Sequence, residues 1–115
     1  MDKFEFEDGG AKATGSPLQI RKMPPFRVFK GSTARRNPSR SETRYEDERR
    51  RLIIDGTLED HPSNPDLMVF TRDYDANSAS MAAGVISGGG NFSGPEKWFE
   101  VASPESFKEW LSRRL

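Results

Sequence analysis

The sequence predicts a small α+β domain over residues 40–115, preceded by an extended and partly disordered N-terminal arm over residues 1–39. Hydrophobic residues make up 33% of the 115 residues and charged residues make up 31%. Globular chains usually contain about 45–50% apolar residues when glycine is counted. Part of this chain is therefore expected to stay extended or to use the core of a partner. From residue 40 onward, short strand patterns alternate with two or three helical patterns.

The arm contains two short apolar segments separated by a glycine-rich stretch. Phe4 and Phe6 alternate with charged residues, as on one face of a strand. Residues 8–16 carry three glycines and no bulky apolar side chain, and they are predicted to be a linker. Phe26 and Val28 share one face of a second short strand. Such strands are not stable alone, so we expect these side chains to dock on the sheet edge or groove of a neighbouring protein. The alternative for the first segment is a disordered acidic tail.

Residues 21–51 form a basic segment. They include eleven lysines and arginines but four acids, in a chain whose formal net charge is zero. Four of the arginines lie in a loop or at a helix start, namely Arg35, Arg36, Arg40 and Arg44. Arginine clusters can bind phosphates or carboxylates through paired hydrogen bonds. The basic segment is therefore either a partner-binding surface or a solvated linker neutralised by the chain's own acidic residues.

Three helices are expected. Ser39 and Thr43 both fit a capping box at the start of the first, which ends at Gly56. The second follows Asp75 or Asn77 as its cap, and small residues recur along it with helical spacing.

The third helix is predicted to start at Ser103, which is followed by proline and an acid. Phe107, Trp110 and Leu111 then form one apolar stripe. We expect Phe107 and Trp110 to contribute to partner binding. The strands Leu67 to Phe70 and Trp98 to Val101 lie before and after the second helix, and the segment from Phe70 to Val101 is predicted to be a scaffold.

The residue types of a catalytic or metal site are not grouped in the sequence. Cysteine is absent, which excludes thiolate chemistry and disulfides. The single histidine, His61, precedes a proline in a turn-rich loop. Asp73 and Asp75 flank a tyrosine without the regular spacing of a calcium loop, so turn and cap roles are favoured. The glycines at 88–90 follow a helix, whereas phosphate loops precede one. We therefore expect no enzyme, no cofactor and no metal.

The order of features from residue 68 to residue 101 resembles a set of small accessory proteins of actinobacterial phages. They share a serine- and alanine-rich helix, a closing Ile-x-x-Gly and a proline turn into a Trp/Phe-Glu strand. The residues that carry the resemblance are Ser78, Ala79, Ala82 or Ala83, Ile86, Gly89, Phe92, Pro95, Trp98 or Phe99, and Glu100. The resemblance implies a phage origin. It implies no activity, because the family has none established.

Two functional hypotheses follow. The first is a non-enzymatic protein-binding or assembly subunit, phage-encoded if the resemblance holds, whose arm docks on another protein or on a second copy within a complex. The alternative is a nucleic-acid-binding accessory protein with a winged-helix-like unit, in which the basic surface from Arg35 to Arg51 contacts phosphates. Binding of that kind weakens steeply with salt. A small-molecule substrate is not expected in either case.

The expected location is intracellular, in the host cytoplasm or in the virion for a phage protein. The longest apolar run falls well short of the roughly 18 residues that span a membrane. The acidic, alternating start does not resemble a secretory signal. We therefore expect no membrane partner.

Overall fold

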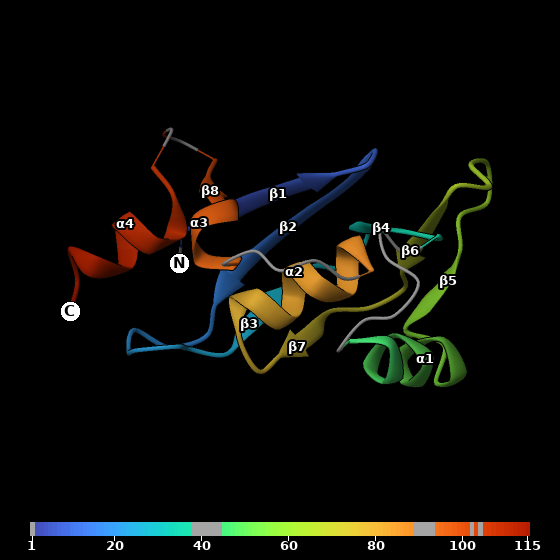
Figure 1. The fold of residues 1–115 in the computed structure, drawn as a ribbon, viewed down its shortest axis with the longest axis horizontal. Helices are drawn as coiled ribbons and strands as arrows, with labels where there is room; N and C mark the ends of the chain where they lie inside the picture. The colour runs from blue at the N-terminus through green and yellow to red at the C-terminus, as the bar shows by residue number, and fades with distance from the viewer. Residues whose placement is uncertain (1, 38–44, 89–93, 102, 104) are drawn as a thin grey trace.

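The computed structural model describes residues 2–37, 45–88, 94–101, 103 and 105–115. Within them the chain forms eight strands and four helices (Figure 1). In chain order these are β1 (Phe4–Asp8), β2 (Ala11–Pro17), β3 (Phe26–Val28), β4 (Thr33–Arg35), α1 (Glu46–Ile54), β5 (Leu58–Asp60), β6 (Leu67–Phe70), β7 (Tyr74–Ala76), α2 (Ala79–Ser87), α3 (Gly94–Lys97), β8 (Phe99–Glu100) and α4 (Phe107–Ser112).

The strands form two antiparallel sheets. The larger sheet has the order β7-β3-β2-β1-β8, and the smaller has the order β4-β6-β5. Helix α2 lies across the larger sheet, with α3 and α4 beyond it near the β8 end, whereas α1 lies beside the smaller sheet (Figure 1). The predicted α+β class is confirmed. The one-turn helix α3 was not expected from the sequence.

Residues 2–35 differ from the expected extended arm, because they supply four strands of the two sheets. The stretch predicted to be a linker is a hairpin turn followed by β2. Gly9 and Gly10 have φ values of 56° and 86°, and two successive positive φ values are typical of the tight turn that joins two twisted strands. The small residues that suggested a linker are needed for close packing. A Cβ on Gly15 would lie 2.5 Å from the Phe26 ring.

Aromatic side chains that were predicted to bind a partner form the centre of the chain's own core. Phe4 packs edge-on against Phe107 and Trp110, with centroid distances of 5.1 and 5.2 Å. Phe26 lies 4.5 Å from Trp98. The predicted contact residues Phe4, Phe6, Phe26, Val28, Phe107 and Trp110 are all buried. The prediction that they face a neighbouring protein is therefore wrong, because α2 and α4 pack against this face of the larger sheet and bury these side chains within the chain.

Two hydroxyl side chains join the larger sheet to the smaller one where the chain passes from β3 to β4. Ser32 Oγ accepts a hydrogen bond from Thr14 N at 3.1 Å, and Thr33 Oγ1 accepts one from Lys12 N at 2.8 Å. Both hydroxyls also donate to the carbonyls of the same two residues. These side chains bind the backbone of β2 on the edge that does not pair with β1.

The helix ends follow local capping rules, although at other residues than predicted. Ser78 caps α2 by accepting from Met81 N, and Ser106 caps α4 in a reciprocal capping box with Glu109. Gly56, with φ of 83°, follows the end of α1 as expected. The predicted start of the first helix at Ser39 to Thr43 lies outside the described residues.

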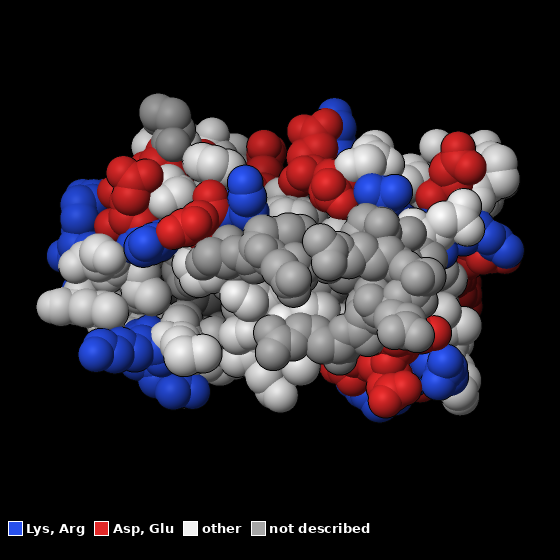
Figure 2. Space-filling model, in the orientation of Figure 1, with Lys and Arg blue, Asp and Glu red and all other residues white. Residues whose placement is uncertain are grey.

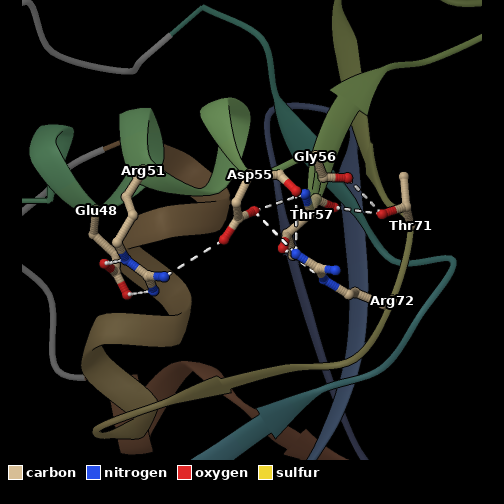
Figure 3. Close-up of polar contacts among 7 residues, drawn as sticks. All are labelled: Glu48, Arg51, Asp55, Gly56, Thr57, Thr71 and Arg72. Atoms are coloured by element: carbon tan, nitrogen blue, oxygen red, sulfur yellow. Dashed lines mark hydrogen bonds and ion pairs between the residues drawn. The ribbon is translucent and has the colours of Figure 1, made fainter.

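The end of α1 is bound to the smaller sheet by a polar network (Figure 3). Arg51 donates to both carboxylate oxygens of Glu48, at 2.8 and 2.9 Å. Asp55 accepts from Thr57 N at 2.9 Å and forms an ion pair with Arg72 at 3.3 Å. The Asp55 contacts fix the end of the helix to the residue before β5 and to the turn between β6 and β7.

A buried arginine provides the second attachment of α1. Arg49 is 5% exposed and donates to the carbonyls of Val85, in the last turn of α2, and of Arg35, at the end of β4. The carbonyl end of a helix carries partial negative charge, which favours a cation there. Burial, and then the positive charge of Arg35, lowers the pKa of Arg49. One guanidinium therefore joins three elements.

Candidate binding surface on the larger sheet

One face of the larger sheet is covered by helix α2, and the opposite face is open. Side chains alternate in exposure along the strands: Phe4 and Phe6 of β1 are buried, whereas Glu5 and Glu7 are exposed. Lys12 of β2 and Asp75 of β7 are exposed in the same alternation. Successive residues of a strand point to opposite faces, so these exposed side chains share the open face. We call it the open sheet face.

Strand pairing places the side chains of the open sheet face in rows. Glu5 pairs with Thr14 on one side and with Phe99 on the other, and Phe29 N donates to Thr14 O at 2.9 Å. One row therefore runs Phe99, Glu5, Thr14, Phe29.

The neighbouring row begins at Val101, whose backbone N donates to Lys3 O at 3.0 Å. It ends at Arg27 and Asp75, which pair across β3 and β7. Lys3 also reaches across to the first row, where its ammonium lies 5.9 Å from the Phe29 ring centroid. The two rows thus bring aromatic, acidic and basic side chains onto one face.

Among the described residues of this face, Phe99 and Val101 are exposed apolar residues, whereas Phe29 is partly buried. Phe99 and Val101 are 45% and 53% exposed, and they lie two residues apart on the same side of the chain. The outer edge of β8 is occupied, because Glu100 N donates to Glu105 O at 2.8 Å and Phe99 bridges to Ser106. The side chains of Phe99 and Val101 are therefore held on a fixed backbone.

Two hollows adjoin the Phe99 ring. One, of about 610 Å³, is also lined by α4 residues, and the other, of about 320 Å³, is lined by Glu5, Glu7 and Lys97. The ion pairs Lys108–Glu96 at 2.9 Å and Arg113–Glu105 border the first hollow. Phe99 thus stands between two concave areas rimmed by charges of both signs.

Ion pairs also cross the open sheet face. Arg27 donates to both carboxylate oxygens of Asp75, at 2.7 and 3.0 Å. The hydrogen bond from Arg27 lowers the pKa of Asp75, and the pKa of Arg27 is raised in return. Glu7 and Lys12 face each other at 3.8 Å. Asp73, expected to act in a turn, accepts from Lys30 N at 2.8 Å.

The arginines predicted as a partner-binding cluster are paired where they are described. Arg35 contacts Asp8 at 3.4 Å and Arg36 contacts Asp60 at 2.5 Å. Arg40 and Arg44 lie outside the described residues. On the side shown in Figure 2, acidic and basic atoms are mixed along much of the margin. Among the described residues, the basic segment therefore does not form a continuous surface of one sign.

The described part of the chain contains no group of three or more histidine, cysteine, aspartate or glutamate side chains that could hold a metal ion. His61 has a local role, since its Nδ1 accepts from the backbone N of Ser63 and Asn64 at 3.1 and 3.0 Å. Gly88 ends α2 in a left-handed conformation.

A family model described as a domain of unknown function, DUF4357, matches residues 4–110. The chain belongs to this family. The match begins in β1 and ends in α4, so the DUF4357 region includes the segment that the sequence suggested was a separate arm. No curated protein and no solved structure matches the chain. In the described residues of this DUF4357 chain, no helix is both long and apolar enough to cross a membrane.

Sequence reasoning missed Phe99 and Val101 as surface residues of the DUF4357 domain. It placed both in the predicted strand Trp98 to Val101 of the scaffold and made neither a candidate site residue. The signal that could have found them is that both faces of this strand carry an apolar residue. Trp98 is fully buried and donates its indole N–H to Ala79 O at 3.1 Å, so the opposite face had to be the outer one.

Proposed function

We propose that this protein is a non-enzymatic protein-binding or assembly subunit whose partner docks on the open sheet face. The observation that carries the proposal is the exposed pair Phe99, in β8, and Val101, directly after it, on a backbone that is hydrogen-bonded on both sides. The docking surface differs from the one expected from the sequence, because the aromatic residues of the expected arm are buried.

The apolar pair has the surroundings of a protein contact. Protein interfaces are typically centred on a few aromatic or aliphatic anchors, with charged groups around them that exclude water. Here the charges near Phe99 have both signs and include the ion pairs Lys108–Glu96 and Glu7–Lys12. A partner with interspersed charges fits such a rim better than a polyanion does.

The alternative of nucleic-acid binding has less support. A recognition helix must present its side chains to the groove, but seven of the nine residues of α2 are buried. Arg35 and Arg36 are engaged with the chain's own carboxylates. The phage origin suggested by the resemblance is a separate prediction, and the docking proposal does not depend on it.

The proposal is tested by comparing two matched surface variants in a partner capture experiment. In one, Phe99 and Val101 are both changed to serine. In the control, Ile53 and Ile54 of α1, which are 46% and 79% exposed, are both changed to serine. Proteins retained by the wild-type chain from its native source are identified by mass spectrometry, and the affinity of the strongest is then measured with purified components.

We expect the first variant to bind at least about tenfold more weakly, because loss of a central anchor commonly costs about 2 kcal/mol or more and about 1.4 kcal/mol is a tenfold change in affinity. The control variant should bind like the wild type. Equal binding by all three proteins, or loss of binding in the control alone, would show that the partner docks elsewhere.

A further inference from the structure

We propose that the partner on the open sheet face is a second copy of this chain, bound face to face. The two-fold axis would run parallel to the strands, between β1 and β2. This inference rests on the proposed protein-binding function of the face and goes further by naming the occupant. It is argued from the charge pattern and the aromatic pattern across four neighbouring strands.

Strand register decides which residues would meet. A two-fold axis in this position lays β1 of one copy over β2 of the other, and β8 over β3. Stacked sheets of this kind pack about 10 Å apart with nearly aligned strands. Each β1 residue then faces a β2 residue of the other copy, namely the residue with which it pairs within its own chain. Glu7 faces Lys12 and Glu5 faces Thr14, since these residues pair within one chain.

The central charges are complementary to themselves under this axis. Within one chain, Lys12 and Glu7 lie 3.8 Å apart, with side chains that are 75% and 67% exposed. Two such pairs laid across each other form a cluster of four charges with alternating sign. An isolated exposed pair contributes little, but a network contributes more. The formal net charge of zero means that two copies do not repel each other at long range.

The flanking aromatic residues are complementary in the same way. Phe99 and Phe29 stand at the two ends of one row, equally far from the axis, because β8 and β3 are the strands next to β1 and β2. The axis therefore brings Phe99 of each copy over Phe29 of the other. The aromatic contact forms twice, once on each side of the charged centre, as a two-fold interface requires.

The size of the face predicts a reversible dimer. Four strands about 4.8 Å apart, with about 3.3 Å per residue, give a footprint below the roughly 800 Å² per partner of a standard stable complex. We therefore expect dissociation on dilution. The test accordingly uses sedimentation velocity over a concentration series that extends to the high micromolar range.

The decisive experiment exchanges the two central charges. Glu7→Lys gives a chain with two central lysines, and Lys12→Glu gives a chain with two central glutamates. Each variant alone should sediment as a monomer, because like charges then meet across the axis. An equimolar mixture should recover the dimer, since each lysine now faces a glutamate. Glu59→Lys, an exposed charge change on β5, is the matched control and should dimerise like the wild type.

Three results would overturn the proposal. The wild-type chain could remain a monomer at every concentration, both charge variants could still dimerise, or the mixture could fail to recover the dimer. If the wild type is a monomer while serine at positions 99 and 101 still abolishes capture of another protein, the proposed function holds and only the identity of the occupant is wrong. Thermal melts of each variant verify that it is folded.

Discussion

The indole Nε1 of Trp110 donates a hydrogen bond to the carboxylate of Asp2 at 2.7 Å, which joins the two ends of the chain across 108 positions of sequence. Arg114 lies 3.8 Å from the Trp110 ring centroid and 3.7 Å from the same carboxylate. This carboxylate therefore holds the start of the chain against α4. The hydrogen bond from Trp110 contributes most to a lowered pKa of Asp2.

Replacing Asp2 by alanine should lower the melting temperature, because it leaves the partly buried indole N–H of Trp110 without its acceptor. Asp2→Asn keeps an acceptor oxygen but removes the charge near Arg114, so it should fall between alanine and the wild type. Differential scanning calorimetry measures the order. If asparagine and alanine destabilise equally, the hydrogen bond is not what stabilises this contact.

Arg49→Lys should destabilise the fold by about 1–3 kcal/mol, because one ammonium cannot satisfy the separate carbonyls that the planar guanidinium reaches. Arg50→Lys is the matched control, since the Arg50 side chain is 61% exposed, and surface changes usually stay within about 0.5 kcal/mol. Urea unfolding of the three proteins measures the difference. Equal midpoints would contradict the structural role of Arg49.

Gly84→Ala should destabilise the protein by about 1–3 kcal/mol, although alanine normally stabilises a helix interior by about 1 kcal/mol relative to glycine. A Cβ at this position would overlap the Tyr45 ring. Combining the change with Tyr45→Ala removes the overlap, so Gly84→Ala should cost much less in that background. A double-mutant cycle from denaturant unfolding tests this, and strict additivity would disprove the contact.

The stability of the wild type should fall on acidification, in part through Glu48. The hydrogen bond from Arg51, and then the hydrogen bond from the Tyr74 hydroxyl at 2.7 Å, lowers the pKa of Glu48 in the folded state. A lowered folded-state pKa adds stability above the unfolded value, which is about 4.3 for glutamate, and this stability is lost as the pH falls through the folded value.

Glu48→Gln should therefore be less stable than the wild type at neutral pH, and the gap in melting temperature should shrink as the pH falls below about 4. Melts recorded at several pH values measure the gap. A gap that stays constant with pH would mean that the charge of Glu48 does not contribute.

The sequence predicted the local elements better than their pairing. The strand patterns at Phe4, Phe26, Leu67 and Trp98 correspond to strands of the structure, because alternation follows from backbone geometry. The pairing of β1 with β2 was missed, since Gly9, Gly10 and the alanines of β2 look like a linker unless the helix packed against them is known. The low apolar content of the chain suggested that its first 39 residues form an extended arm. The core is instead filled by small residues and a few large aromatic side chains.

The candidate surface could be predicted only in part. Exposure of Phe99 depends on which side of the chain at residues 98–101 packs against α2. That is a tertiary property. The basic segment could be recognised from its composition, but the carboxylates that pair with Arg35 and Arg36, Asp8 and Asp60, lie far away in sequence. Linear charge counts cannot reveal such pairing, which removes Arg35 and Arg36 as free cations.

The central claim, that a protein docks at Phe99 on the open sheet face, is tested most directly by site-specific photo-crosslinking. The photoreactive residue benzoylphenylalanine replaces Phe99 in one chain and Ile54 of α1 in another, and the crosslinked peptides are identified by mass spectrometry. We predict that position 99 crosslinks to one defined site on a protein, and to the β3 region of a second copy if the dimer is correct. Position 54 should give no such product. Crosslinking at position 54 but not at position 99 would contradict the account.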